Sequence, residues 1–131
     1  MEMEITIDAV GEARAGAVWE RYMDPRQWSS WATQIVSVEY SMSRVCTQSF
    51  GRLEGPLWLR LDFEVTEVDE AGWTWTSKVW FKNRKLGLTL THGVASRPDG
   101  SRTWLTLDGP PAFVLPYLPY ARCAIGRLVR R

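Results

Sequence analysis

The first 31 residues carry two kinds of hydrophobic pattern. Residues 3–9 alternate between apolar and polar side chains, which is the period of a β-strand with one wet face. Residues 15–22 place their apolar side chains at helical spacing. Pro25 disfavours helical geometry in Asp24 and so ends this helix, and Pro25 can itself occupy the first turn of a second short helix that reaches Trp31. The pattern predicts one strand followed by two short helices.

Strand-like patterns return at residue 34 and continue to residue 107. The clearest run is residues 57–66, where apolar odd positions alternate with a largely polar second face. Residues 48–53 precede a turn and should pair back against this run. Turns are expected at the clusters of Gly, Pro, Asp and Asn in residues 54–56, 69–72, 82–85 and 98–100. These runs predict about six consecutive antiparallel strands.

The last segment has a helical apolar stripe made of Ala121, Ala124, Ile125 and Leu128, with Leu118 one turn earlier. Pro116 and Pro119 each remove a backbone donor from this region. The C-terminal helix should therefore either begin near Pro119 or carry a kink there.

Length and composition indicate a single domain over residues 1–131. The formal net charge is +1, so no global field favours nucleic acid as a partner. Cys46 and Cys123 are expected to be reduced, largely buried thiols, since they lack metal-ligand spacing. The acidic start and the lack of a long apolar run predict no signal peptide and no integral membrane segment. We expect a cytoplasmic protein.

Several loose motifs, taken in their order, carry a resemblance to a known family. They are Val18-Trp19, Asp24-Pro25, Trp28 to Trp31, Gly51 to Pro56, residues 65–68 leading to Trp73-Thr74-Trp75, and His92 through Gly100 to Gly109-Pro110. The chain resembles the START-related lipid-binding superfamily (SRPBCC), in its polyketide cyclase/dehydrase-like branch. The resemblance implies the α+β helix-grip fold, in which a curved antiparallel sheet of about seven strands wraps around a C-terminal helix.

The resemblance also implies an apolar cavity between sheet and C-terminal helix that binds a lipid, a polyketide or another hydrophobic molecule. A bulky inward face is consistent with such a cavity, but it can equally fill itself to make a solid core. Trp28 and Trp31 should form the wall or rim towards the small helices. The candidate pocket residues are Trp31, Leu61, Phe63, Trp75, Ser77, Phe81, Leu88, Leu90, His92, Leu105, Tyr117 and Ala121.

His92 is the only histidine, and it takes the inward phase of a leucine-lined strand. Burying it demands a hydrogen-bond partner or a solvated cavity end, and Ser77 is the expected partner. The pair could form the polar end of the pocket and orient a carbonyl or hydroxyl of the ligand. His92 is either a satisfied structural histidine or, with Ser77, a catalytic acid/base candidate. Glu67, expected at the end of an inward strand face, is either a second acid/base or a solvated carboxylate.

The standard catalytic motifs are absent from the sequence. There is no GxSxG elbow, no zinc-ligand spacing and no phosphate- or dinucleotide-binding glycine pattern, so we expect neither a metal nor another cofactor. Two basic clusters lie at residues 78–85 and 122–131. The first is either a solvated hairpin or a contact with a membrane surface or with an acidic group of the ligand, and the second complements a helix dipole or meets a membrane.

Three classes of function stay open from the sequence. The chain is a binding or carrier protein for a hydrophobic small molecule, a polyketide cyclase or dehydratase that uses polar pocket residues, or a module whose groove docks another protein. Whether it is an enzyme is undecided at this level. It is expected to be a monomer or a homodimer.

Overall fold

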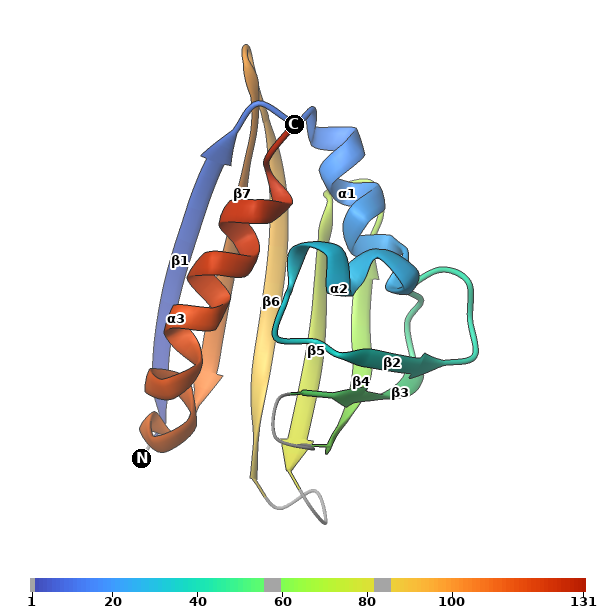
Figure 1. The fold of residues 1–131 in the computed structure, drawn as a ribbon, viewed down its shortest axis with the longest axis vertical. Helices are drawn as coiled ribbons and strands as arrows, with labels where there is room; N and C mark the ends of the chain where they lie inside the picture. Colours follow the sequence, from blue (N-terminus) through green and yellow to red (C-terminus); the bar gives the residue numbers. More distant parts are fainter. Residues whose placement is uncertain (1, 56–59, 82–85) are drawn as a thin grey trace.

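The computed structural model describes residues 2–55, 60–81 and 86–131, which form one curved sheet with helices on one side of it (Figure 1). The strands are β1 (Met3–Gly11), β2 (Ser37–Tyr40), β3 (Ser49–Glu54), β4 (Arg60–Asp69), β5 (Thr74–Phe81), β6 (Leu86–Arg97) and β7 (Gly100–Gly109). The helices are α1 (Ala15–Met23), the 3-10 turn η1 (Pro25–Gln27), α2 (Trp28–Trp31) and α3 (Pro111–Leu128).

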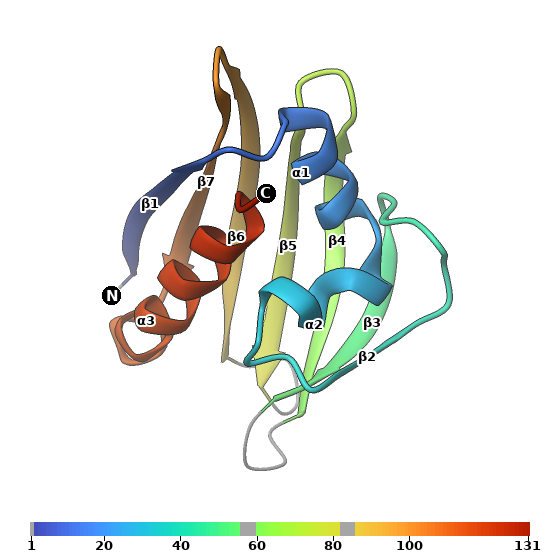
Figure 2. The same ribbon diagram turned by 45° about the horizontal axis from the view of Figure 1, so that its top comes forward.

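All seven strands are antiparallel neighbours in the order β1-β7-β6-β5-β4-β3-β2. The sheet curves strongly, so that β2 and β3 run across the view in which β5 and β6 stand upright (Figure 1). α3 lies over β1, β7 and β6, while α1 approaches β6 and β7 and extends with α2 over the β4 and β5 side (Figure 2). The inner face of the sheet is thus shared between two groups of helices.

Two buried clusters form the core, one under each group of helices. The first packs α1 and α2 against β4 and β5 and centres on Tyr22, which has 0% exposure. The second packs α3 against β1, β6 and β7 and includes Leu107 and Val114, both at 0% exposure. Because each cluster rests on a different helix group, any space between sheet and helices lies where the two clusters meet.

The predicted order of elements is confirmed. The first helix ends at Met23, and the Asp24 side chain accepts a hydrogen bond from the backbone N–H of Arg26 at 3.1 Å, which caps the turn that Pro25 begins. The segment 48–53 pairs back as predicted, since β3 lies beside β4 with Phe63 opposite Gly51. None of the described helices is long and apolar enough to cross a membrane.

Of the two alternatives for the C-terminal helix, a start near Pro119 is wrong, and the helix instead continues through that proline. α3 begins eight positions earlier, at Pro111, and runs through both Pro116 and Pro119. Pro111 costs no helical hydrogen bond at this position, because the first N–H groups of a helix have no partner within it. The two internal prolines lie on the exposed side of the helix. Burial of the opposite side of the helix, including Val114 and Ala121, compensates for the backbone hydrogen bonds that Pro116 and Pro119 cannot donate.

Glu67 does not lie on the inward face of β4. The register between β4 and β5 shifts between Val65 and Glu67, which is a β-bulge. Val65 points inward with 0% exposure, and the extra residue turns Glu67 outward into solvent. Val68 then resumes the packed face opposite Trp75. The Glu67 carboxylate is therefore solvated and does not point towards the helix side of the sheet.

The burial predicted for the cysteines is also wrong in part. Both thiols are free, but Cys46 is only half-buried and Cys123 is exposed on α3. Some predictions fall on residues outside the described ranges: the first part of the 57–66 run, the turn residue Pro56, and Lys82, Arg84 and Lys85 of the basic hairpin. The strand that the run predicts is seen from Arg60 onward.

The end of α3 is fixed against the turn between β1 and α1. The Ala13 N–H donates to the Val129 carbonyl at 3.0 Å, and Arg21 donates through one nitrogen to the carbonyls of Leu128 and Arg130 at 2.6 and 2.7 Å. A Cβ at Gly11 would overlap the Val129 carbonyl group. Glycine at this position therefore allows the close approach of β1 to the helix end.

We predict that Gly11→Ala lowers the free energy of unfolding by about 1–3 kcal/mol, because backbone atoms at Val129 cannot move aside cheaply. The matched control is Gly126→Ala in α3, the helix that ends beside Val129, where nothing lies within 4 Å of the added methyl group. This variant should gain about 0.5–1 kcal/mol from helix propensity. Urea unfolding of both variants checks the pair, and equal effects would contradict the proposed close approach.

Candidate functional site

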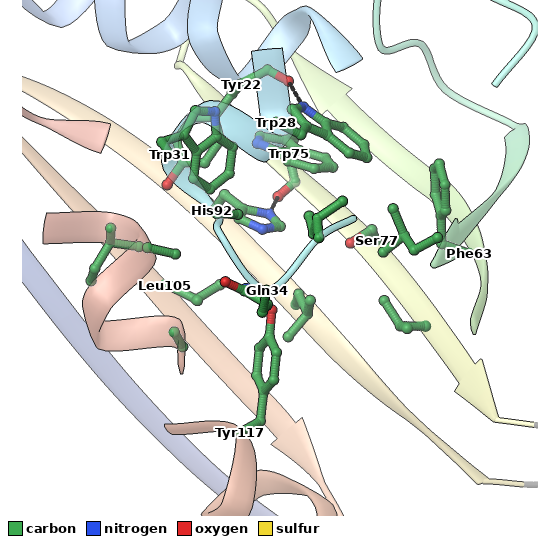
Figure 3. Close-up of a pocket in the computed structure, with 18 residues that line it drawn as sticks. Tyr22, Trp28, Trp31, Gln34, Phe63, Trp75, Ser77, His92, Leu105 and Tyr117 are labelled. Atoms are coloured by element: carbon green, nitrogen blue, oxygen red, sulfur yellow. Dashed lines mark hydrogen bonds between the residues drawn. The ribbon is translucent and has the colours of Figure 1, made fainter. Parts of the chain in front are cut away.

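A small inner cavity of about 60 Å³ lies where the two core clusters meet, between the sheet and all three α-helices (Figure 3). A water molecule needs roughly 10–15 Å³ of such space, and a cavity that takes a benzene ring is about 150 Å³. The inner cavity therefore fits a few water molecules or one small functional group. It is lined by Tyr22, Trp28, Trp31, Ala32, Gln34, Ile35, Leu53, Phe63, Trp75, Ser77, Val79, Leu90, His92, Leu105, Tyr117, Ala121, Ala124 and Ile125.

A larger outer pocket of about 330 Å³ adjoins the inner cavity and lies beneath the N-terminal half of α3. Its lining is mostly aliphatic and aromatic, and Glu54 is its one charged residue among those described. The lining residues are Gln34, Ile35, Leu53, Glu54, Gly55, Leu61, Val79, Leu88, Leu90, Ala112, Phe113, Pro116, Tyr117 and Tyr120. Pockets of about 300–1,000 Å³ with such linings commonly hold small organic ligands.

Gln34 and Tyr117 mark the boundary between the two spaces, because both side chains line both of them. The Gln34 amide donates to the Tyr117 hydroxyl at 3.2 Å, joining the loop after α2 to α3 (Figure 3). Burial raises the pKa of Tyr117, so its hydroxyl stays neutral. A molecule passing from the outer pocket to the inner cavity must pass beside this hydrogen bond or replace it.

The inner end of the cavity is a stack of three flat rings. The His92 imidazole lies on the Trp75 indole, with centroids 3.9 Å apart and planes 8° apart. Trp28 stacks on Trp75 at 5.9 Å, and its indole N–H donates to the Tyr22 carbonyl at 2.8 Å. Cross-strand pairing places His92 directly opposite Trp75, which is why the rings meet.

Tyr22 closes this end of the site from α1. Its ring makes edge contacts with Trp31, Trp75 and His92, with centroids 5.4, 5.7 and 5.2 Å away. The Thr103 hydroxyl donates to the Gly93 carbonyl at 2.8 Å, so it accepts from the Tyr22 hydroxyl at 2.6 Å. Burial raises the pKa of Tyr22 far above its ordinary value, and the phenol stays protonated.

His92 is neutral, and the atom that carries its proton is fixed by a carbonyl. Nδ1 lies 3.2 Å from the Trp75 carbonyl oxygen, which can only accept, so Nδ1 carries the hydrogen. Burial lowers the pKa of His92 to about 3, while the hydrogen bond to Trp75 raises it by a smaller amount. Nε2 therefore holds a lone pair, and it has no partner among the described residues.

The expected pairing of Ser77 with His92 is wrong. Ser77 lies opposite Leu90 on β6, two positions along β5 from the residue that faces His92. The imidazole instead bonds to the Trp75 carbonyl. Ser77 is 4% exposed and lines the inner cavity, and its hydroxyl has no partner in the described part of the chain. The Trp75 indole N–H is also buried without a partner among these residues.

The structure places most of the predicted pocket residues around these two spaces. Trp31, Phe63, Trp75, Ser77, Leu90, His92, Leu105, Tyr117 and Ala121 line the inner cavity, and Leu61 and Leu88 line the outer pocket. Phe81 belongs to β5, but its side chain lies outside what the structure describes. Two polar candidates are thus near the cavity without being joined to each other.

Sequence reasoning missed two groups of lining residues. Gln34 and Ile35 belong to an irregular loop after α2, where no periodicity indicates which side chains face inward. Ala112, Phe113 and Pro116 belong to the first turns of α3, which the prolines made unrecognisable as helix. In the described residues, no group of three or more His, Cys, Asp or Glu side chains could hold a metal ion.

Comparison with solved structures gives strong similarity at low sequence identity. Ara h 8.0201 matches with a TM-score of 0.78 at 8% identity, over 98% of this chain and 95% of that one. DynU16, a protein in the dynemicin biosynthetic locus, matches with a TM-score of 0.73 at 15% identity. That match covers 98% of this chain but only 45% of DynU16. An uncharacterised protein from Rhizobium leguminosarum matches at 0.75 and 11% identity, over 98% and 92% of the two chains.

The chain has the helix-grip fold. The predicted fold is confirmed by the strand order and by these neighbours, whose low sequence identity shows the fold alone. Neither a family model nor a curated protein matches the sequence itself. The helix-grip fold places the inner cavity and the outer pocket between sheet and α3, so the functional argument depends on their linings.

We predict that His92 makes folding stability depend on pH. The unfolded chain binds a proton on this residue below about pH 6.5, whereas the native imidazole resists protonation down to about pH 3. Stability due to this residue is therefore complete above pH 6.5 and falls as the pH drops, by up to about 1.4 kcal/mol per pH unit. Urea unfolding at several pH values, compared with His92→Phe, measures the effect. Parallel pH profiles for the two proteins would show that the imidazole is accessible to protons when folded.

Proposed function

We propose that this protein binds an apolar small molecule in the outer pocket, with part of the ligand reaching the inner cavity. The observation that carries the proposal is the outer pocket itself: about 330 Å³ of space beneath α3, bordered largely by apolar side chains. Protein interiors are normally packed without voids of this size, because each unfilled space forfeits dispersion contacts. A ligand that fills the pocket restores those contacts.

The burial pattern around the pocket supports a hydrophobic ligand. Leu61 and Val79 are only half-buried although they face the helix side of the sheet, and Tyr120 is 50% exposed at the pocket. Each square ångström of apolar surface that a ligand covers contributes about 25 cal/mol. Covering these side chains is therefore a sufficient source of affinity without a charged partner.

Binding is favoured over catalysis by the state of the polar groups. A general base works best with a pKa near the operating pH, and burial lowers the pKa of His92 to about 3. No hydrogen bond joins Ser77 to His92, so Ser77 lacks a base in contact that would activate it as a nucleophile. DynU16, one of the structural neighbours, comes from a biosynthetic locus, which keeps a cyclase or dehydratase as the second candidate.

The proposal places the protein in the cytoplasm, as a monomer or homodimer that acts on a small molecule rather than on nucleic acid. The two free cysteines support a reducing compartment, because Cys123 is exposed and would be open to oxidation elsewhere. The near-neutral net charge of +1 supports the lack of a nucleic-acid partner. Contact with another protein is the third candidate and has no specific support in the pocket.

We predict that the neutral fluorescent probe N-phenyl-1-naphthylamine binds the protein and that Val79→Phe weakens its affinity at least about tenfold. Val79 lines both spaces, so the larger ring occupies the volume that the probe needs. Fluorescence titration measures the affinity, and circular dichroism checks that the variant is folded. Ala112→Phe, at an exposed position in the outer lining, is a second blocking variant that leaves the core unchanged.

The matched control is Lys78→Phe, which adds an aromatic ring to the same strand on the exposed outer face of the sheet. This variant should bind the probe like the unmodified protein. Unchanged binding in both Val79→Phe and Ala112→Phe would place the probe elsewhere and contradict the proposal.

A further inference from the structure

The linings of the two spaces specify the charge of the ligand. Among the described residues, no Lys, Arg, Asp or Glu side chain lines the inner cavity, and the one charged side chain at the outer pocket is the carboxylate of Glu54. An anionic group would lose its hydration without gaining a cation, and Glu54 would repel it. The described lining therefore favours an uncharged molecule over a carboxylate such as that of a fatty acid.

The inner cavity also offers a hydrogen-bond acceptor that nothing in the described chain satisfies. Nδ1 of His92 donates to the Trp75 carbonyl, which leaves Nε2 as an acceptor and prevents it from donating. The edge of the imidazole away from that carbonyl lies on the side of Gln34 and Tyr117 (Figure 3). A buried acceptor without a partner costs about 1–3 kcal/mol, so a donor supplied by a ligand is stabilising there.

Ser77 provides the complementary group on the same cavity wall. Its hydroxyl can donate as well as accept, and it has no side-chain or backbone partner in the described residues. The space of about 60 Å³ admits a hydroxyl group but not the ring that carries it. The ring system must then remain in the outer pocket, with the hydroxyl passing the Gln34–Tyr117 contact.

We propose that the ligand is an uncharged, ring-containing molecule whose hydroxyl group donates its hydrogen to Nε2 of His92 and accepts from Ser77. This inference rests on the proposed function and names the class of molecule that the same site takes. Of the two ligand groups expected from the sequence, a carbonyl is disfavoured at His92 and a hydroxyl is favoured, because two acceptors cannot bond to each other. His92 acts here as a specificity-determining residue through its fixed tautomer.

The experiment compares 2-naphthol with 2-methoxynaphthalene, which has the same ring and an oxygen that only accepts. Each displaces N-phenyl-1-naphthylamine from the unmodified protein and from His92→Phe, which keeps a flat ring on Trp75 and removes the acceptor. One hydrogen bond is worth about 0.5–1.5 kcal/mol. The preference for 2-naphthol over its methyl ether should therefore fall about fivefold in His92→Phe. Thr6→Val, which loses an exposed hydroxyl on β1 that lines neither space, should keep the original preference.

Three results would overturn the inference while leaving the proposed function intact. They are an equal preference in the unmodified protein and His92→Phe, failure of 2-naphthol to displace a probe that does bind, and displacement by 2-naphthoate at the same concentration as 2-naphthol. Failure of N-phenyl-1-naphthylamine itself to bind instead contradicts the proposed function. The melting temperature of each variant confirms that it is folded under the conditions of the titration.

Discussion

The hydrogen bond from the Tyr22 hydroxyl to Thr103 is the interaction on which the inner end of the cavity depends. The hydroxyl donates to Thr103, which in turn donates to the Gly93 carbonyl, and this fixes α1 over the centre of the sheet. The Tyr22 carbonyl also accepts from the Trp28 indole and so orients the start of α2. With 0% exposure, neither bond competes with solvent. Tyr22 thereby closes over the ring stack that the cross-strand pair of Trp75 and His92 forms.

The two spaces lie under different parts of α3, and directed bonds hold its C-terminal turn against α1. Ala13 and Arg21 bind the carbonyls of its C-terminal turn, close to the α1 contact. Towards Pro111, Ala112, Phe113 and Pro116 of α3 line the outer pocket, and Ala112 and Pro116 remain exposed there. Aromatic packing fills the inner end, and the outer end stays open. A tight polar recess behind a wide apolar entrance is the result.

The sequence predicts the fold here better than the site. Alternation and helical spacing are local properties, so residues 3–9 and 15–22 report their structure directly. The bulge at Val65 and Glu67 is invisible in the alternation, and it reverses the side of the sheet on which the carboxylate lies. The register between β5 and β6 cannot be read from the alternation either, and it decides that His92 lies opposite Trp75 rather than Ser77. Prediction from pattern therefore identifies the inward residues but not which of them touch.

Cys123 is an exposed free thiol on α3 that can be modified chemically. The helix borders both spaces through Tyr117 and Ala121, while Cys123 is exposed and Cys46 is half-buried on the opposite edge of the sheet, next to Tyr40. A spectroscopic label attached at Cys123, the more exposed of the two thiols, would lie outside the ligand site. Displacement of α3 relative to the sheet could then be followed as a change in the distance between this label and a group on the sheet. The interior of the protein would not have been altered.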